Sequence, residues 1–182
     1  MVVPKQRFIQ LGDYSEGSRG LDPNTFAQRF GEAFFLHHGP LGELKLAVDQ
    51  KRTISLEAPL SGTRRTFNPQ ADYLVFPIHK TVAENPDKNV FWIGRVRSNE
   101  VVIPDESVSA VHAYLMRSAG GDFHLQDMSS QNGTRVNGLP VAPQGRGEPT
   151  KLESGDRVHF GRAEFTFLKM HEFRNLIASL LV

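Results

Sequence analysis

Short runs of apolar residues separated by turn-forming residues fill the second half of the chain. From residue 71 onward these runs recur at close spacing, and Gly, Pro, Asn and Asp lie between them. This punctuation is typical of an antiparallel β-sandwich. It predicts strands near residues 72–78, 90–95, 100–103, 111–117, 122–127, 134–137, 157–160 and 163–169.

A helix is expected in the first part of the chain. Asp22 can cap its start, Pro23 suits the first helical position, and Gly39-Pro40 marks the predicted end. Within this range phenylalanines recur every four residues, at positions 26, 30 and 34. We expect this aromatic stripe to pack on the rest of the protein, and a groove for a partner is the alternative.

The remaining segments complete the predicted organisation. Residues 44–48 and 53–58 alternate apolar and polar side chains around a polar turn, which indicates a short hairpin. The end of the chain places apolar residues on one helical face. The predicted division is a loosely held arm at 1–20, a helix and hairpin appendage at 21–70, a β domain at 71–169 and a C-terminal helix at 170–182.

Composition excludes several functional classes. Of 182 residues, 39% are hydrophobic and 23% are charged, which suits a folded core. Basic and acidic residues number 21 and 20, so the basic face of a general nucleic-acid binder is not expected. The chain has no cysteine, which excludes disulfides and thiolate chemistry.

Metal and membrane binding are not expected either. The seven histidines are scattered, and the adjacent His37 and His38 would point in different directions on a helix. No apolar run approaches the roughly 20 residues that span a bilayer, and the N-terminus lacks the apolar stretch of a signal peptide. We therefore expect a cytoplasmic protein without metal or cofactor.

An ordered set of short motifs carries the functional information. With their flanking residues they resemble the forkhead-associated (FHA) domain family over residues 71–169. The motifs are Gly94-Arg95, Ser109-Ala110-Val111-His112, Asn132-Gly133-Thr134 and Asn137-Gly138. The resemblance implies a mainly β fold, a sandwich of two twisted antiparallel sheets. It also implies a peptide site in the loops at 95–99, 104–110 and 128–134.

The resemblance implies a role for each residue of the site. Arg95 would contact the phosphate of a bound phosphopeptide, since its planar donors match phosphate oxygens. Ser109 would donate a hydroxyl hydrogen bond to another phosphate oxygen. Asn132 would hold the peptide backbone, with Gly133 beside it in a tight turn.

Other motif residues would support the site without touching the phosphate. His112 begins an apolar strand and is expected to hold the loops together. Gly94, Thr134, Asn137 and Gly138 are expected to satisfy turn and strand-end geometry.

The sequence departs from the family pattern at one position. The residue after the motif serine often carries a donor side chain, but here it is Ala110. Gln131, in a variable position before Asn132, can still donate a hydrogen bond. Arg97 in the first loop could compensate for Ala110, or it could be a solvated surface residue.

The resemblance implies a module that binds phosphothreonine in a protein or peptide modified by a serine/threonine kinase. The alternative is a degenerate scaffold that mediates association independently of phosphate, as Ala110 would favour. An enzyme is not expected, because Ser109 and His112 lie three residues apart around a strand start and would point to different faces. The oligomeric state and the identity of the partner stay open.

Overall fold

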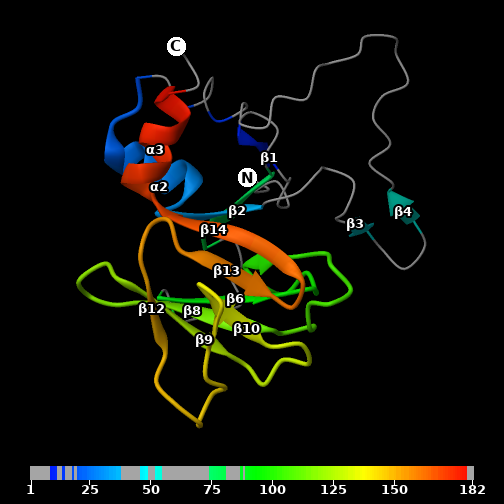
Figure 1. Ribbon diagram of the computed structural model, residues 1–182. Helices are drawn as coiled ribbons and strands as arrows, with labels where there is room; N and C mark the ends of the chain where they lie inside the picture. The colour runs from blue at the N-terminus through cyan, green and yellow to red at the C-terminus, as the bar shows by residue number, and fades with distance from the viewer. Residues whose placement is uncertain are drawn as a thin grey trace.

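The computed structural model describes residues 9–11, 14, 18, 20–37, 46–48, 52–54, 74–80, 87 and 89–179. Within these residues two sheets pack face to face, with helices at one side (Figure 1). The predicted mainly β sandwich is confirmed.

The larger sheet contains strands from both ends of the chain. Its strands lie in the order β1 (Ile9–Gln10), β5 (Leu74–Ile78), β2 (Ala33–His37), β14 (Ala163–Lys169), β13 (Arg157–Phe160), β10 (Thr134–Val136) and β11 (Leu139–Pro140). All of its pairings are antiparallel.

The smaller sheet carries the first loop of the expected site. Its order is β12 (Thr150–Leu152), β9 (Phe123–Asp127), β8 (Ala113–Arg117), β6 (Val90–Gly94) and β7 (Val101–Val102). The pairing of β6 with β7 is parallel, because the chain between them loops back on itself. That loop is the segment that begins with Arg95.

The core between the sheets is rich in aromatic side chains. Phe35, Phe160, Phe165 and Phe167 are fully buried, with ring centroids 5.4 to 6.0 Å from Phe35 to the other three. Each fully buried aromatic side chain contributes about 1.5–3 kcal/mol through removal of apolar surface from water. The resulting scaffold is rigid enough to hold loops at fixed separations.

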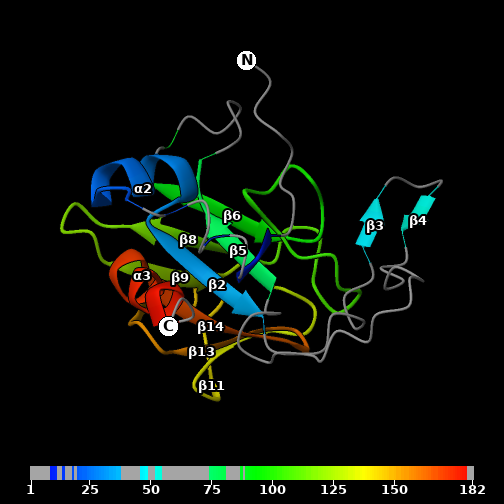
Figure 2. The same cartoon turned by 90° about the horizontal axis from the view of Figure 1, so that it is seen from above.

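A second aromatic cluster covers the outer face of the larger sheet. It is formed by the two helices α2 (Pro23–Phe30) and α3 (Met170–Ser179), which lie on this face in Figures 1 and 2. Phe34 from β2 stacks on Phe173 from α3, with 3.9 Å between ring centroids. Phe26 is fully buried in the same cluster. The expected packing of the phenylalanines on the rest of the protein is therefore observed.

The predicted helix is shorter than the sequence pattern indicates. It ends at Phe30, and Gly31 follows with a φ of 111°, a conformation that ends helices and favours glycine. Phe34 and Phe35 belong to strand β2, which pairs with β5 and β14. The prediction of a helix up to Gly39 was wrong because these long-range pairings override the four-residue repeat.

The described residues nearest the N-terminus pack on the sandwich. Strand β1 pairs with β5, and Leu11 and Tyr14 are almost completely buried in the second aromatic cluster. Leu11 and Tyr14 are therefore not loosely held, as was expected of residues 1–20, because their apolar side chains pack on the outer face of the larger sheet. Strand β2 lies within the predicted appendage at 21–70, yet it is a strand of the larger sheet. The predicted boundary at residue 71 therefore does not separate the appendage from the sheet.

The two remaining expectations concern the hairpin and the membrane. Strands β3 (Leu46–Val48) and β4 (Arg52–Ile54) pair antiparallel within the predicted hairpin. Residues 59–70 of the predicted appendage and the last residues of the predicted C-terminal helix, 180–182, lie outside the described residues. In the described part of the chain no helix is long and apolar enough to cross a membrane.

Candidate functional site

Three loops meet at one end of the sandwich, and a buried histidine connects two of them. His112 is fully buried at the start of β8. Its Nδ1 accepts a hydrogen bond from the Ser109 backbone N–H at 3.0 Å. Because that nitrogen is an acceptor, the proton lies on Nε2, which donates to the Gly133 carbonyl oxygen at 3.2 Å.

The environment of His112 favours its neutral form. Burial lowers the pKa of the imidazole, and the hydrogen bond to Gly133 and the charge of Asp127 oppose this effect without cancelling it. A neutral His112 keeps the two loops in a fixed relation.

Arg95 lies directly after β6, with its backbone fixed and the end of its side chain accessible. Its N–H donates to the Ser109 carbonyl oxygen at 2.9 Å. Its Nε donates to the Val108 carbonyl oxygen at 3.2 Å. Within the described residues the two terminal guanidinium nitrogens have no partner, and the residue is exposed. Arg95 therefore presents two charged donors at the end of the sandwich.

The Ser109 hydroxyl is oriented by the neighbouring loop. Its Oγ accepts a hydrogen bond from the Gln131 backbone N–H at 3.0 Å. The hydroxyl proton has no acceptor in the part of the chain that the structure describes. A serine held in this way is a donor to an incoming anion, and it lies next to Arg95.

Asn132 lies in the third loop and keeps part of its hydrogen-bonding capacity. Its Nδ2 donates to the Ser107 carbonyl oxygen at 2.8 Å. An amide has two N–H donors and one carbonyl acceptor, so one donor and the acceptor remain for a ligand. Gly133 follows with a φ of 75°, which explains the requirement for glycine at this turn.

Asp127 holds the third loop through hydrogen bonds to residues near both of its ends. Its carboxylate accepts from the Ser130 backbone N–H at 2.9 Å, the Ser130 hydroxyl at 2.6 Å and the Thr134 hydroxyl at 2.6 Å. Asp127 and Thr134 are both almost completely buried. The loop that carries Gln131 and Asn132 is therefore anchored at both of its ends.

Two supporting residues were not found from the sequence. Asn99 is 3% exposed, and its Nδ2 donates to the carbonyl oxygens of Val96 and Ala110, each at 2.8 Å. Glu100 is 1% exposed, accepts from the Trp92 N–H at 2.7 Å and pairs with Lys80 at 3.1 Å. Neither belongs to a motif, and only the three-dimensional crossing of the loops reveals them.

The close approach of two loops explains Gly94. A Cβ atom at this position would lie 2.3 Å from the Ala110 carbonyl oxygen. Such a contact forces the backbone to move, so only glycine keeps Arg95 and Ala110 in register. The Ala110 side chain itself is exposed at this crossing.

Four further residues named from the sequence lie either on the exposed surface or away from the site. Arg97 and Gln131 are exposed, and no side-chain hydrogen bond or ion pair of either occurs within the described residues. Asn137 and Gly138 form the two-residue turn between β10 and β11, with φ values of 51° and 82°. This turn lies at the opposite end of β10 from Gly133, and the Asn137 side chain contacts Asp156 and the Arg157 N–H.

A shallow cavity of about 410 Å³ lies beside the third loop. Asn132, Gly133 and Thr134 contribute to its lining, but neither Arg95 nor Ser109 does. The accessible donors of Arg95 and Ser109 are therefore on an open surface and not inside this cavity.

Residues 91–161 match the model of the FHA domain. The chain carries an FHA domain. The resemblance expected from the motifs is thus confirmed.

Relatives of this FHA domain occur in larger proteins. Protein FraH of Nostoc sp. (strain PCC 7120) is 36% identical over 93 residues, which are 46% of this chain and 30% of FraH. The glycogen accumulation regulator GarA of Mycolicibacterium smegmatis is 36% identical over 75 residues, 41% of this chain and 43% of GarA. The chain thus spans less than half the length of these curated relatives.

Solved FHA structures resemble part of the chain. The FhaA FHA domain, solved with the intracellular domain of Rv3910, is 30% identical, with 46% of this chain and 84% of that chain covered and a TM-score of 0.38. A structure described as part of a study of phosphothreonine-dependent FHA domain interactions is 29% identical. It covers 45% of this chain and 78% of its own, with a TM-score of 0.39.

Proposed function

We propose that this FHA domain binds phosphothreonine in a partner protein that a serine/threonine kinase has modified. Arg95 and Ser109 bind the phosphate, and Asn132 and Gly133 lie against the peptide backbone. The FHA domain acts here as a binding module and not as an enzyme.

One observation carries this proposal. The terminal guanidinium nitrogens of Arg95 and the hydroxyl proton of Ser109 have no partner in the described structure, although the backbones of these two residues are hydrogen-bonded to each other. Charged and neutral donors that converge on open space are suited to a tetrahedral anion. The buried scaffold around His112 fixes the donors before the ligand arrives, which lowers the entropic cost of binding.

The geometry does not suit nucleophilic catalysis by Ser109. A catalytic histidine takes the proton of the serine hydroxyl. Here His112 contacts the backbone N–H of Ser109, while the hydroxyl oxygen contacts the Gln131 N–H. Asp127 makes its hydrogen bonds to Ser130 and Thr134. His112 and Asp127 therefore hold the loops in place, and the Ser109 hydroxyl proton stays available to a ligand.

An oriented peptide library tests the proposal. Immobilised protein is exposed to one library with a fixed phosphothreonine and to a second with a fixed threonine, and selected peptides are measured by calorimetry. Binding only in the first library supports the proposal. Equal capture from both libraries would instead favour an interaction independent of phosphate, for which the missing donor at Ala110 is the structural argument.

The variant Arg95→Ala identifies the phosphate ligand. Hydrogen bonds to charged groups contribute about 1.5–3 kcal/mol each, so the loss of two should weaken binding by about a hundredfold or more. Arg157→Ala is the matched control. Arg157 is exposed and lies on β13, next to the end of β10 that is away from the site. Unchanged affinity in folded Arg95→Ala would refute the proposed phosphate site.

A further inference from the structure

The chain contains two Asn-Gly pairs, Asn132-Gly133 in the third loop and Asn137-Gly138 in the turn between β10 and β11. Asparagine deamidates readily before glycine, because glycine has no Cβ atom to shield its backbone nitrogen. Both asparagines are exposed, and the glycines have similar φ values of 75° and 82°. Sequence and exposure therefore do not distinguish the two pairs, but their hydrogen bonds do.

The side chain of Asn137 is held at both of its polar atoms. Its Nδ2 donates to the Asp156 carboxylate at 2.8 Å, and its Oδ1 accepts from the Arg157 N–H at 2.9 Å. The Asp156 carboxylate is itself fixed, because it accepts from the Glu153 N–H at 2.8 Å. Rotation of the Asn137 amide therefore requires two hydrogen bonds to break.

The side chain of Asn132 is held at one polar atom. Its Nδ2 donates to the Ser107 carbonyl oxygen at 2.8 Å. Within the described residues, the Asn132 Oδ1 and the Gly133 N–H have no hydrogen-bond partner. Only one hydrogen bond therefore opposes rotation of this amide toward the Gly133 nitrogen.

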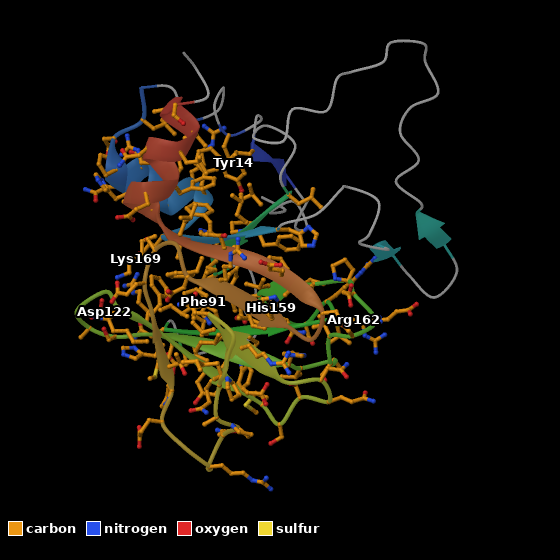
Figure 3. The ribbon with its side chains drawn as sticks, in the orientation of Figure 1. Tyr14, Phe91, Asp122, His159, Arg162 and Lys169 are labelled. Atoms are coloured by element: carbon orange, nitrogen blue, oxygen red, sulfur yellow. The ribbon has the colours of Figure 1, made fainter. Side chains whose placement is uncertain are left out.

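Gly133 is held through its carbonyl oxygen, which leaves its nitrogen accessible. The carbonyl oxygen accepts from His112 Nε2 at 3.2 Å and from the Gly161 N–H at 3.0 Å. Figure 3 labels Arg162, which follows Gly161 in the turn at this end of the sandwich. Apart from its chain neighbours, a Cβ atom at Gly133 would meet no atom of the described residues within 4 Å. The surroundings therefore leave room for a reaction at the Gly133 nitrogen.

We propose that Asn132 deamidates spontaneously and that this change switches off the phosphopeptide site as the protein ages. The Gly133 nitrogen attacks Cγ of Asn132, and the new C–N bond closes a succinimide ring. The bond between Cγ and Nδ2 breaks, and ammonia leaves with the proton of the Gly133 N–H. Water then opens the ring, which leaves aspartate or isoaspartate and consumes no other reactant.

The product no longer suits the role proposed for Asn132, so this part of the inference rests on the proposed function. A carboxylate has no N–H group, and the hydrogen bond to the Ser107 carbonyl oxygen is lost. The new negative charge lies in the loop whose Gln131 N–H contacts the Ser109 hydroxyl, and it repels a phosphate there. Isoaspartate also lengthens the loop backbone by one carbon atom.

A time course at physiological temperature and pH tests the inference on the whole protein. Trypsin cleaves after Arg135, so the two asparagines fall into separate peptides, residues 118–135 and 136–146. Mass spectrometry measures the replacement of an NH group by an oxygen atom in each peptide, and fragmentation locates it. The same time course in urea is the control, because neither pair is held by the fold there.

Folded protein should deamidate faster at Asn132 than at Asn137. The expected ratio is about two- to tenfold, as for one additional hydrogen bond at Asn137. In urea the ratio should fall to nearly one. Asp156→Ala removes a partner of Asn137 and should raise the rate at Asn137 without changing the rate at Asn132. A melting temperature verifies that this variant is folded.

Calorimetry with a phosphothreonine peptide measures the effect on binding. Deamidated protein, separated from fresh protein by ion exchange, should bind about tenfold more weakly or worse. Asn132→Asp should also bind weakly. Asn175→Asp is the matched control, because Asn175 is exposed on α3 and the same chemical change there should leave the affinity unaltered. Saturating phosphothreonine peptide should slow deamidation at Asn132 and not at Asn137.

The outcomes separate this inference from the proposed function. If folded protein deamidates no faster at Asn132 than at Asn137, the inference is refuted and the phosphate site stands. If the product binds the phosphothreonine peptide as tightly as fresh protein does, the switch is refuted. If fresh protein binds that peptide no better than its unphosphorylated form, the proposed function and the switch both fail, and the masses alone decide whether Asn132 deamidates.

Discussion

A donor introduced at position 110 should strengthen phosphopeptide binding. Ala110 follows Ser109, which we propose binds the phosphate, and its side chain is only a methyl group. Its carbonyl oxygen accepts hydrogen bonds from the Asn99 side chain at 2.8 Å and the Val96 N–H at 3.3 Å. Because the backbone is fixed and the side chain is exposed, Ala110→Lys and Ala110→Arg should fold normally and place a cation beside the phosphate.

The size of the gain follows from the exposure of the site. An exposed charge pair contributes about 0.2–1 kcal/mol, and a hydrogen bond to a charged group up to about 3 kcal/mol. A partly solvated contact between these limits corresponds to a gain of about two- to thirtyfold in affinity. The gain should decrease as salt is raised, since the added interaction is mainly electrostatic.

Calorimetry with one phosphothreonine peptide at two salt concentrations measures the effect. Val111→Lys is a matched control. Val111 is 41% exposed, and the substitution adds the same charge one residue further along the chain. If both lysine variants bind equally tightly, the gain is a general charge effect. If Ala110→Lys does not improve binding at all, the phosphate does not lie beside Ser109.

Arg97 provides a second test of the missing donor at position 110. If Arg97 already compensates for the missing donor, Arg97→Ala alone should weaken binding strongly, and Ala110→Lys should restore it. If Arg97→Ala has no effect, Arg97 is a solvated residue of the first loop. An absence of effect at both positions would contradict the placement of the peptide between these loops.

Three further predictions concern stability and loop geometry. His112→Ala leaves the Ser109 N–H without its partner, at a cost of about 1–3 kcal/mol, and removes one of the two hydrogen bonds to the Gly133 carbonyl oxygen, which the Gly161 N–H still contacts. The melting temperature should therefore fall by several degrees. Since the pKa of His112 is lowered by folding, the stability it adds is complete above about pH 6.5 and is lost as the pH falls. The wild type should therefore lose more stability between pH 7 and pH 5 than the variant does, as measured by thermal unfolding. Phe34→Ala should cost about 3–5 kcal/mol in chemical denaturation, and half-buried Phe30→Ala less. Gly94→Ala should reduce phosphopeptide affinity, whereas Gly120→Ala should not, because a Cβ atom at Gly120 would meet only the Ser118 hydroxyl oxygen at 3.8 Å.

Local motifs predicted the β-rich half of the chain well. Strands β13 and β14 have the predicted bounds, and β6, β8 and β9 differ from prediction by one or two residues. Turn residues and alternating side chains are local signals, so they remain visible in one sequence. The motif residues Arg95, Ser109 and Asn132 also lie together at one end of the sandwich, where their contacts to a ligand remain a proposal.

The elements that were missed depend on distant parts of the chain. All five residues of β2 are buried, so the strand lacks the alternation that identifies a half-exposed strand. Phe34 continued the helical repeat of Phe26 and Phe30, and only pairing with β14 shows it to be in a strand. Asn99 was missed for a similar reason, because its side chain donates to the Ala110 carbonyl oxygen on another loop.

The position of β2 between β5 and β14 has a consequence for the order in which the protein can fold during synthesis. Phe35 is paired with Phe167, which follows it by 132 positions. At a translation rate of about 5–20 residues per second, β2 leaves the peptidyl-transferase centre about 7–26 s before its partner does. During that time a strand with four apolar residues out of five has no partner on one edge, and such strands are prone to aggregate. We expect newly made chains to need protection by a chaperone until β14 has emerged.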